Sequence, residues 1–235
     1  MTSPQTTDER IWQAALELFA RQGFAGTTTR DIAEASALTP GSLYHYMGSK
    51  DDLLEQVMFG SMTGLLGASR ALAAGSGEPI STIAGLVRLH VAVHAKHRFE
   101  AKVVDSEVEQ LGEANRKKIA TMRDKYEILW RSTITDGVDR GVFHVDDQRL
   151  AGLALLGMCT EVANWYRPRG RMTPEVLGLQ FADMSLALLR TTGPDGRPIT
   201  IADVTSPDPA PYLATYEERG GYGMVGAKAT SRSGS

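Results

Sequence analysis

One short segment, TPGSLYHYMGSK at residues 39–50, carries polar side chains whose types and spacing suit contact with another molecule. Tyr44, His45 and Tyr46 follow one another directly, after a glycine and a serine. Successive residues on a helix point about 100° apart, so the three rings cannot all enter one core. Tyrosine hydroxyls and a lysine ammonium are good phosphate donors, and serine or histidine can reach base edges.

Three histidines form a second group of chemically capable side chains. His90, His94 and His97 fall at positions i, i+4 and i+7, on one face of a predicted helix. This spacing leaves three interpretations open: a metal site, a polar spot in a ligand cavity, or histidines that are hydrogen-bonded in the core. The last two are the commoner outcome, so we expect no metal and no cofactor.

Catalytic chemistry has little support in the sequence. The acidic run at 105–113 precedes three basic residues at 116–118, a pattern typical of a helix surface with ion pairs. No G-x-S-x-G, H-E-x-x-H or phosphate-loop motif is present. We therefore assign no catalytic residue and expect that the protein is not an enzyme.

Composition is that of an ordinary globular protein, with 42% hydrophobic and 23% charged residues in 235. Cys159 is the only cysteine, which excludes an intrachain disulfide and favours a reducing cytoplasm. The N-terminus does not resemble a signal peptide, and no apolar run reaches the length of a membrane span, so we expect no membrane partner. The net charge of −3 argues against coating nucleic acid through bulk charge.

Helical periodicity dominates from residue 8 to 190 and predicts an all-α fold. Four helix starts fall within the first fifty residues, including a capping box at Thr28 and a Thr39-Pro40 start. Longer helices are predicted near 50–72, 80–97, 99–110, 113–140, 147–166 and 174–190. The pattern predicts a compact N-terminal helical unit at 1–50, a larger helical unit at 51–190, and a mostly irregular Gly/Pro/Ser-rich tail at 191–235, in which TIADV and PYLATY dock locally.

Short helix, tight turn and short helix is the outline of a helix-turn-helix, whose second helix enters the DNA major groove. The runs GF-x-x-TT-x-x-DIA and SLY-H-Y-x-x-SK-x-x-L within residues 11–57 resemble the DNA-binding domain of the tetracycline-repressor (TetR) family. The resemblance implies that residues 1–50 form a helix-turn-helix DNA-binding domain and that residues 51–190 form a helical regulatory and dimerisation domain. The family usually has Gly where Ala37 stands and Phe where Met47 stands, and both changes look tolerable.

The resemblance and the side-chain chemistry together predict the contact residues. We expect DNA contacts from Thr28, Thr29, Arg30, Thr39, Pro40, Gly41, Ser42, Tyr44, His45, Tyr46 and Lys50. Residues 1–60 hold four basic against eight acidic side chains, so binding must rely on amides, hydroxyls and a few cations. For the effector cavity we expect Leu86, His90, Val93, His94, Val108, Met122, Tyr126, Leu129, Trp130, Trp165 and Arg167.

The segment NWYRPRGRMTPE at 164–175 is similar to a subgroup of TetR regulators that control lipid, steroid or acyl-CoA catabolism.

Apolar stripes on the last two long helices predict the homodimer contact through Leu150, Leu153, Leu156, Gly157, Leu177, Phe181, Met184 and Leu188. The hypothesis is a repressor that binds a pseudo-palindromic operator as a homodimer and is released by a small apolar or amphipathic effector. The alternatives are a helical small-molecule-binding protein or enzyme that has lost DNA binding, or a non-enzymatic adaptor.

Overall fold

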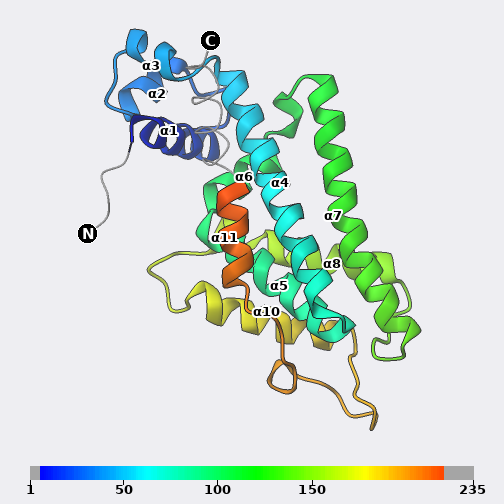
Figure 1. Ribbon diagram of the computed structural model, residues 1–235. Helices are drawn as coiled ribbons and strands as arrows, with labels where there is room; N and C mark the ends of the chain where they lie inside the picture. Colours follow the sequence, from blue (N-terminus) through cyan, green and yellow to red (C-terminus); the bar gives the residue numbers. More distant parts are fainter. Residues whose placement is uncertain (1–5, 220–235) are drawn as a thin grey trace. The chain divides into compact units, whose positions relative to one another are not determined.

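The structure is a computed structural model that describes residues 6–219, and all its regular elements are helices (Figure 1). In chain order these are α1 (Thr7–Gln22), α2 (Thr29–Ala35), α3 (Pro40–Tyr46), α4 (Lys50–Ser76), α5 (Pro79–Lys96), α6 (Arg98–Ser106), η1 (Val108–Gln110), α7 (Glu113–Asp139), α8 (Gln148–Thr160), α9 (Val162–Trp165), α10 (Pro174–Leu188), η2 (Ile201–Asp203) and α11 (Ala210–Arg219). The predicted all-α fold is confirmed. Of the helices in the described range, none has the length and apolar character needed to cross a lipid bilayer.

Local capping explains where the N-terminal helices begin. The Thr28 hydroxyl accepts a hydrogen bond from the Asp31 amide at 3.1 Å, and the Asp31 carboxylate accepts one from the Thr28 amide at 2.8 Å. Thr39 caps α3 by accepting from the Ser42 amide at 3.2 Å, and Pro40 occupies the first helical position. Each cap satisfies amides that have no partner inside the helix and stabilises it by about 1 kcal/mol.

The predicted ranges agree with α4, α5, α7 and α10 to within four residues at either end. Two predicted helices differ more. The one at 99–110 ends at Ser106 and is followed by the separate 3-10 turn η1. The one at 147–166 divides at Glu161 into α8 and α9, although the Glu161 amide still donates to the Gly157 carbonyl at 3.3 Å.

Contacts divide the chain into two compact units. Among the described residues, the first comprises 6–64, the segment Phe99–Thr121, and 217–219. The second comprises Leu65–Arg98 and Met122–Tyr216. Both α4 and α7 therefore contribute residues to each unit. The predicted domain boundaries at residues 50 and 190 follow the sequence pattern instead and stay a prediction.

The first unit has a small apolar core under α1, α2 and α3. Trp12, Phe19, Ile32 and Leu43 are all buried there. The indole N–H of Trp12 also donates a hydrogen bond to the Glu100 carboxylate at 3.4 Å, so α6 is held within this unit.

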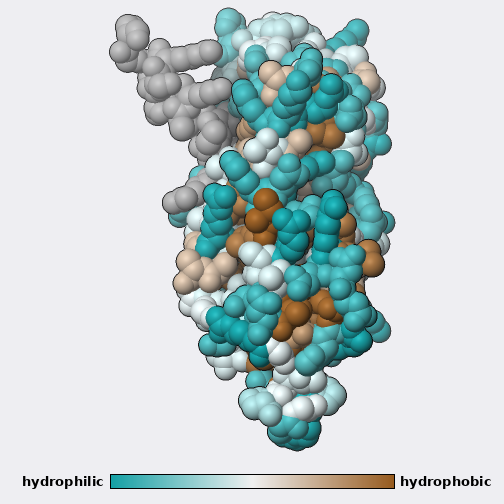
Figure 2. Space-filling view, turned by 90° about the vertical axis from the view of Figure 1, so that its right-hand side faces the viewer, coloured by the Kyte–Doolittle hydropathy of each residue, from teal (hydrophilic) through white to brown (hydrophobic). Residues whose placement is uncertain are grey.

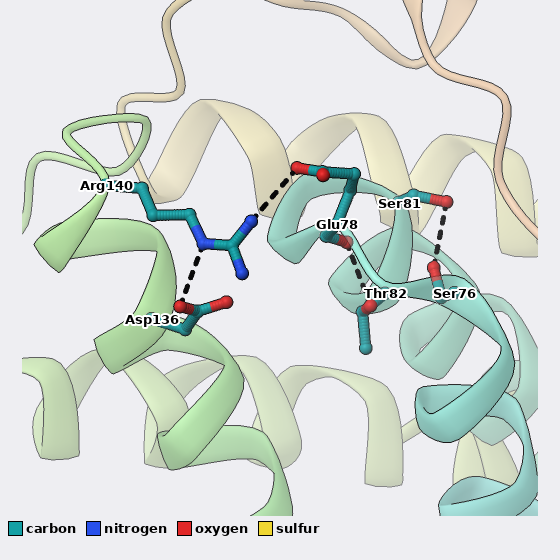
Figure 3. A network of polar contacts seen from close by, with 6 residues as sticks. All are labelled: Ser76, Glu78, Ser81, Thr82, Asp136 and Arg140. Carbon is teal, nitrogen blue, oxygen red and sulfur yellow. Dashed lines mark hydrogen bonds and ion pairs between the residues drawn. The ribbon is translucent and has the colours of Figure 1, made fainter.

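Helix α5 is the centre of the second unit. Most of its residues are buried, and it packs mainly against α10, α8 and α9. At one end of α5 and α7, Arg140 donates to Asp136 at 2.9 Å and to Glu78 at 3.3 Å, while Ser76 and Ser81 share a hydrogen bond (Figure 3). These polar contacts connect the ends of α4, α5 and α7.

The segment after α10 is more ordered than the sequence predicts, although its last residues, 220–235, lie outside the described range. Arg88 of α5 donates to the carbonyl of Pro207 at 3.0 Å, and the Ile201 amide donates to Asp183 at 2.8 Å. Leu213 and Tyr216 of α11 are buried in the second unit. TIADV and PYLATY thus dock as expected, but within a 3-10 turn and a ten-residue helix.

Candidate DNA-binding and effector sites

Helix α3 presents its aromatic side chains to solvent. Leu43 is fully buried, whereas Tyr44 and Tyr46 are 60% and 52% exposed and His45 is also exposed. A side chain at Gly41 would meet no atom within 4 Å, so the surface beside it is open. The exposure that the sequence predicts for these rings is confirmed, whereas their contact with DNA stays a prediction.

The hydroxyls at the start of α3 are already engaged within the helix. Besides accepting from the Ser42 amide, the Thr39 hydroxyl lies 2.9 Å from the Ser42 hydroxyl and shares a hydrogen bond with it. One of these two hydroxyl hydrogens is therefore used internally. The pair can still offer its remaining hydrogen and lone pairs to a phosphate or a base edge.

At the start of α2, Thr28 and Arg30 are exposed and Thr29 is half-buried. Hydrogen bonds from the Thr28 amide and hydroxyl lower the pKa of the Asp31 carboxyl. Arg30 is consequently an exposed cation next to a fixed negative charge. Thr28 acts mainly as a cap, which leaves Arg30 as the side chain of this helix best placed to meet a phosphate.

Lys50 has a different environment from the one its sequence position suggests. Its ammonium donates to the carbonyls of Phe24 and Thr27 at 2.7 and 2.8 Å, and lies 4.0 Å from the centre of the Phe24 ring. Two of its three hydrogens are thus committed to the loop between α1 and α2. This geometry favours a role in fastening α4 to that loop, and the assignment of Lys50 to a DNA phosphate stays a prediction.

The turn before α3 and the residue after α3 accommodate the two departures from the family pattern. Ala37 has a φ of 56°, the left-handed conformation that glycine adopts without cost and other residues adopt at about 1–2 kcal/mol. Met47 is buried and fills the apolar position after α3. The helix-turn-helix geometry is therefore kept, with strain at Ala37.

A cluster of polar side chains lies inside the second unit. His90 Nδ1 is 2.9 Å from Tyr126 Oη, His90 Nε2 is 3.3 Å from Thr160 Oγ1, and His94 Nδ1 donates to the His90 carbonyl at 2.9 Å. The two imidazoles stack with ring centres 3.9 Å apart. We call Ser69, His90, His94, Tyr126, Trp130 and Thr160 the polar cluster.

Burial keeps the polar cluster uncharged near neutral pH. It lowers the pKa of His94 to about 4, and burial together with the neighbouring His94 lowers the pKa of His90 well below its usual range. Burial likewise raises the pKa of Tyr126, so its phenol stays protonated. The cluster therefore offers hydrogen bonds without a fixed charge.

Comparison with known proteins bears on both units. A family described as "Bacterial regulatory proteins, tetR family" matches residues 11–57, and one described as "Tetracyclin repressor-like, C-terminal domain" matches residues 76–189. The chain is 31% identical to the HTH-type transcriptional repressor KstR2 of Rhodococcus jostii (strain RHA1) over 175 residues, which cover 73% of this chain and 85% of the relative. The chain belongs to the TetR family.

Two solved structures have the same fold. The ketosteroid transcriptional regulator KstR2 of Mycobacterium tuberculosis superimposes with a TM-score of 0.75 at 23% identity, over 81% of this chain and 98% of that one. AibR, in complex with isovaleryl coenzyme A and operator DNA, superimposes with a TM-score of 0.68 at 23% identity, over 80% of this chain and all of that one. With the family matches, the fold does not favour the alternative of a helical enzyme or binding protein without DNA binding.

Within the TetR framework, the predicted effector residues divide into two groups. Leu86, His90, Val93, His94, Tyr126 and Trp130 are buried in the second unit, and Met122 and Leu129 are half-buried there. Val108 is half-buried and belongs to the first unit. Trp165 is 44% exposed, and the exposed Arg167 donates to nearby backbone carbonyls.

The third histidine of the predicted histidine face lies apart from the other two. His97 contacts the Tyr216 ring, apart from the stacked pair, and no group of His, Cys, Asp or Glu in the described residues is arranged to hold a metal. Ser69 and Thr160 could not be identified from the sequence, because serine and threonine are common in apolar helices and only the fold brings them to Tyr126 and His90.

The predicted dimer surface is partly wrong. Leu177 and Phe181 are buried in the core of the second unit and cannot meet a partner. Exposed apolar side chains on α8 and α10 remain at Leu150, Leu153, Val176, Leu179, Met184 and Leu188. Apolar surface interrupts the polar surface on the face shown in Figure 2, which is the side of Figure 1 where α7 and α8 lie.

Proposed function

We propose that this TetR-family protein is a ligand-responsive transcriptional repressor that binds a pseudo-palindromic operator as a homodimer. The observation that carries the proposal is the exposed face of α3 within a helix-turn-helix, in a chain whose family matches extend through the regulatory helices. A relative that is 31% identical is itself a transcriptional repressor. As a regulator of bacterial DNA, the protein acts in the cytoplasm and catalyses no reaction.

Operator binding rests on a few directed contacts. Tyr44 and Tyr46 extend from α3, and Arg30 supplies an exposed cation from α2. Since acidic residues outnumber basic ones in residues 1–60, few counterions are released on binding. The operator affinity therefore falls less steeply with salt than that of a strongly basic DNA-binding protein.

The homodimer forms through the exposed apolar faces of α8 and α10. A two-fold axis places each copy's Leu153 and Met184 against the same surface of the other copy. Pairing these helices buries apolar surface and holds two α3 helices at a fixed separation of about 34–36 Å, one turn of DNA.

The effector binds in the second unit, among the buried predicted residues of α5 and α7. Its class is an apolar or amphipathic molecule of the lipid, steroid or acyl-CoA kind. Two features support this class: the predominantly apolar surroundings of the polar cluster, and the names of the relatives, one a ketosteroid regulator and one bound to isovaleryl coenzyme A.

Control passes along helices that belong to both units. Helix α4 leaves the first unit after Gly64 and enters the second at Leu65, so a change around Ser69 can alter the orientation of its N-terminal half. A tenfold to hundredfold loss of operator affinity needs a coupling of about 1.4–2.8 kcal/mol, within the usual range for allosteric proteins. Operator DNA must weaken effector binding by the same factor.

A mobility-shift assay with Tyr44→Phe tests the DNA side of the proposal. Because the phenol hydroxyl is assigned to a phosphate, the variant binds the operator and unrelated DNA more weakly by a similar factor, about 1 kcal/mol or fivefold. The matched control is Tyr212→Phe, which changes a half-buried tyrosine of α11 in the second unit. Equal operator affinity of wild type and Tyr44→Phe would remove the phosphate contact from the account.

A further inference from the structure

The polar cluster contains two buried hydrogen-bond donors without an acceptor. Trp130 Nε1 and Ser69 Oγ lie in side chains that are fully buried, and neither has a hydrogen-bond partner among the described residues. A buried donor left unpaired costs about 1–3 kcal/mol. Native folds rarely keep such groups unless they serve a purpose.

Both donors lie beside the same phenol. The Ser69 hydroxyl and the Trp130 indole N–H approach Tyr126 Oη as weak donors and so act to lower the pKa of the phenol, although burial is the larger effect and raises it. Neither reaches that oxygen in hydrogen-bond geometry. Ser69 comes from α4, and Tyr126 and Trp130 from successive turns of α7. Two unpaired donors from two helices therefore lie beside one phenol, whose oxygen already shares a hydrogen bond with His90.

No cation is available in the cluster to balance a negative charge. His90 and His94 are neutral because burial lowers their pKa, and burial raises the pKa of the nearby Cys159 thiol to about 12. Leu72, Leu86, Ile134 and other buried apolar residues form the same core. A carboxylate would lose its hydration there and gain no opposite charge, whereas an uncharged oxygen would lose little.

We propose that Trp130 Nε1 and Ser69 Oγ, beside the Tyr126 phenol, form the recognition point for an uncharged oxygen acceptor, a ketone, ester or thioester carbonyl, at the buried end of the apolar effector. This inference rests on the proposed function and narrows it, because the recognition point rejects an anionic group. An anionic part of an effector must lie elsewhere. Binding at Ser69 acts directly on α4, the helix shared by the two units.

The first test needs no effector and uses thermal unfolding of the full chain. Ser69→Ala removes an unpaired hydroxyl, while the control Ser185→Ala removes an equally buried hydroxyl that donates to the Phe181 carbonyl at 2.7 Å. Ser69→Ala leaves the melting temperature unchanged or raises it, and Ser185→Ala lowers it by about 2–4 °C. Equal losses in both variants would show that Ser69 is satisfied within the fold, which overturns the proposal.

The same comparison applies to the tryptophans. Trp130→Phe and Trp12→Phe each replace a buried indole with a smaller phenyl ring, but only the Trp12 indole has a hydrogen-bond acceptor, Glu100. We expect the smaller fall in melting temperature for Trp130→Phe. A fall as large as that of Trp12→Phe counts against the proposal.

The second test uses 2-decanone and decanoate as probes, with the same chain length and different end groups. Near neutral pH, 2-decanone raises the melting temperature of the wild type, decanoate does not, and the rise is lost in Ser69→Ala and Trp130→Phe. The proposal is overturned if decanoate raises the melting temperature as much as 2-decanone does. It is also overturned if both variants keep the full rise with 2-decanone, or if the wild type shows no rise up to the solubility limit of the ketone. Operator binding by the wild type is measured alongside, since its absence would instead refute the proposed function.

Discussion

Replacing Lys50 distinguishes two roles for this residue. It either fastens α4 to the loop between α1 and α2 by hydrogen bonds, or it contacts a DNA phosphate. In Lys50→Met, the apolar stem is kept and the ammonium is lost, together with its bonds to the Phe24 and Thr27 carbonyls and its position over the Phe24 ring. A hydrogen bond from a charged donor contributes about 1.5–3 kcal/mol when buried. Lys50 is half-buried, so we expect a total loss of about 2 kcal/mol from the first unit.

Hydrogen exchange and the salt dependence of DNA binding report the two roles independently. A loss of about 2 kcal/mol makes the most protected amides of α1 to α3 exchange about 30-fold faster. If Lys50 only fastens the fold, the slope of log affinity against log salt stays at the wild-type value. If it binds a phosphate, the slope falls by about 1.

Arg30→Gln is the matched control, because Arg30 is an exposed cation of the same unit. We expect it to reduce the salt slope by about 1 and to leave amide exchange unchanged. The fastening role would be refuted if Lys50→Met reduced the slope in the same way while exchange stayed at the wild-type rate.

Three further predictions follow from the geometry. Ala37→Gly relieves the left-handed backbone in the turn, so it stabilises the first unit by about 1 kcal/mol, and α2 and α3 amides that exchange no more slowly would contradict this. Leu153→Asp combined with Met184→Asp puts charges on the exposed α8 and α10 faces of both copies, so light scattering shows a monomer where the wild type is a dimer. A double variant that dimerises with unchanged affinity would contradict the assigned surface. His94 has a pKa of about 4 in the folded protein against an ordinary value of 6.5, so the unfolded chain binds more protons between these two pH values. The free energy of unfolding therefore falls by roughly 3 kcal/mol as the pH drops from 6.5 to 4, and His90 acts in the same direction. A His94→Gln variant that loses stability as steeply over this pH range would contradict the assignment.

The sequence could predict those features that depend on near neighbours along the chain. Capping residues such as Thr28 and Thr39 act within three residues, so the helix starts were predictable. The exposure of Tyr44 and Tyr46 followed from helix geometry, since Leu43 alone can enter the small core.

Features that depend on tertiary contacts could not be predicted in this way. Lys50 bonds to carbonyls 23 and 26 residues away, and nothing local distinguishes it from a lysine that faces DNA. Helix α10 is apolar on more than one face, so periodicity could not separate the buried Leu177 and Phe181 from the exposed Met184 and Leu188. Ser69 and Thr160 enter the polar cluster only because α4, α7, α5 and α8 come together in the second unit.

Selection of binding sites from random DNA by the purified protein tests the central claim most directly. A homodimeric repressor with one α3 helix per copy enriches two inverted copies of one short sequence, with centres about 10 base pairs apart or a multiple of this spacing. The double variant Leu153→Asp and Met184→Asp, used under the same conditions, loses the enrichment of paired sites. The absence of any enriched sequence, or enrichment of a single unpaired site by the wild type, would contradict the account.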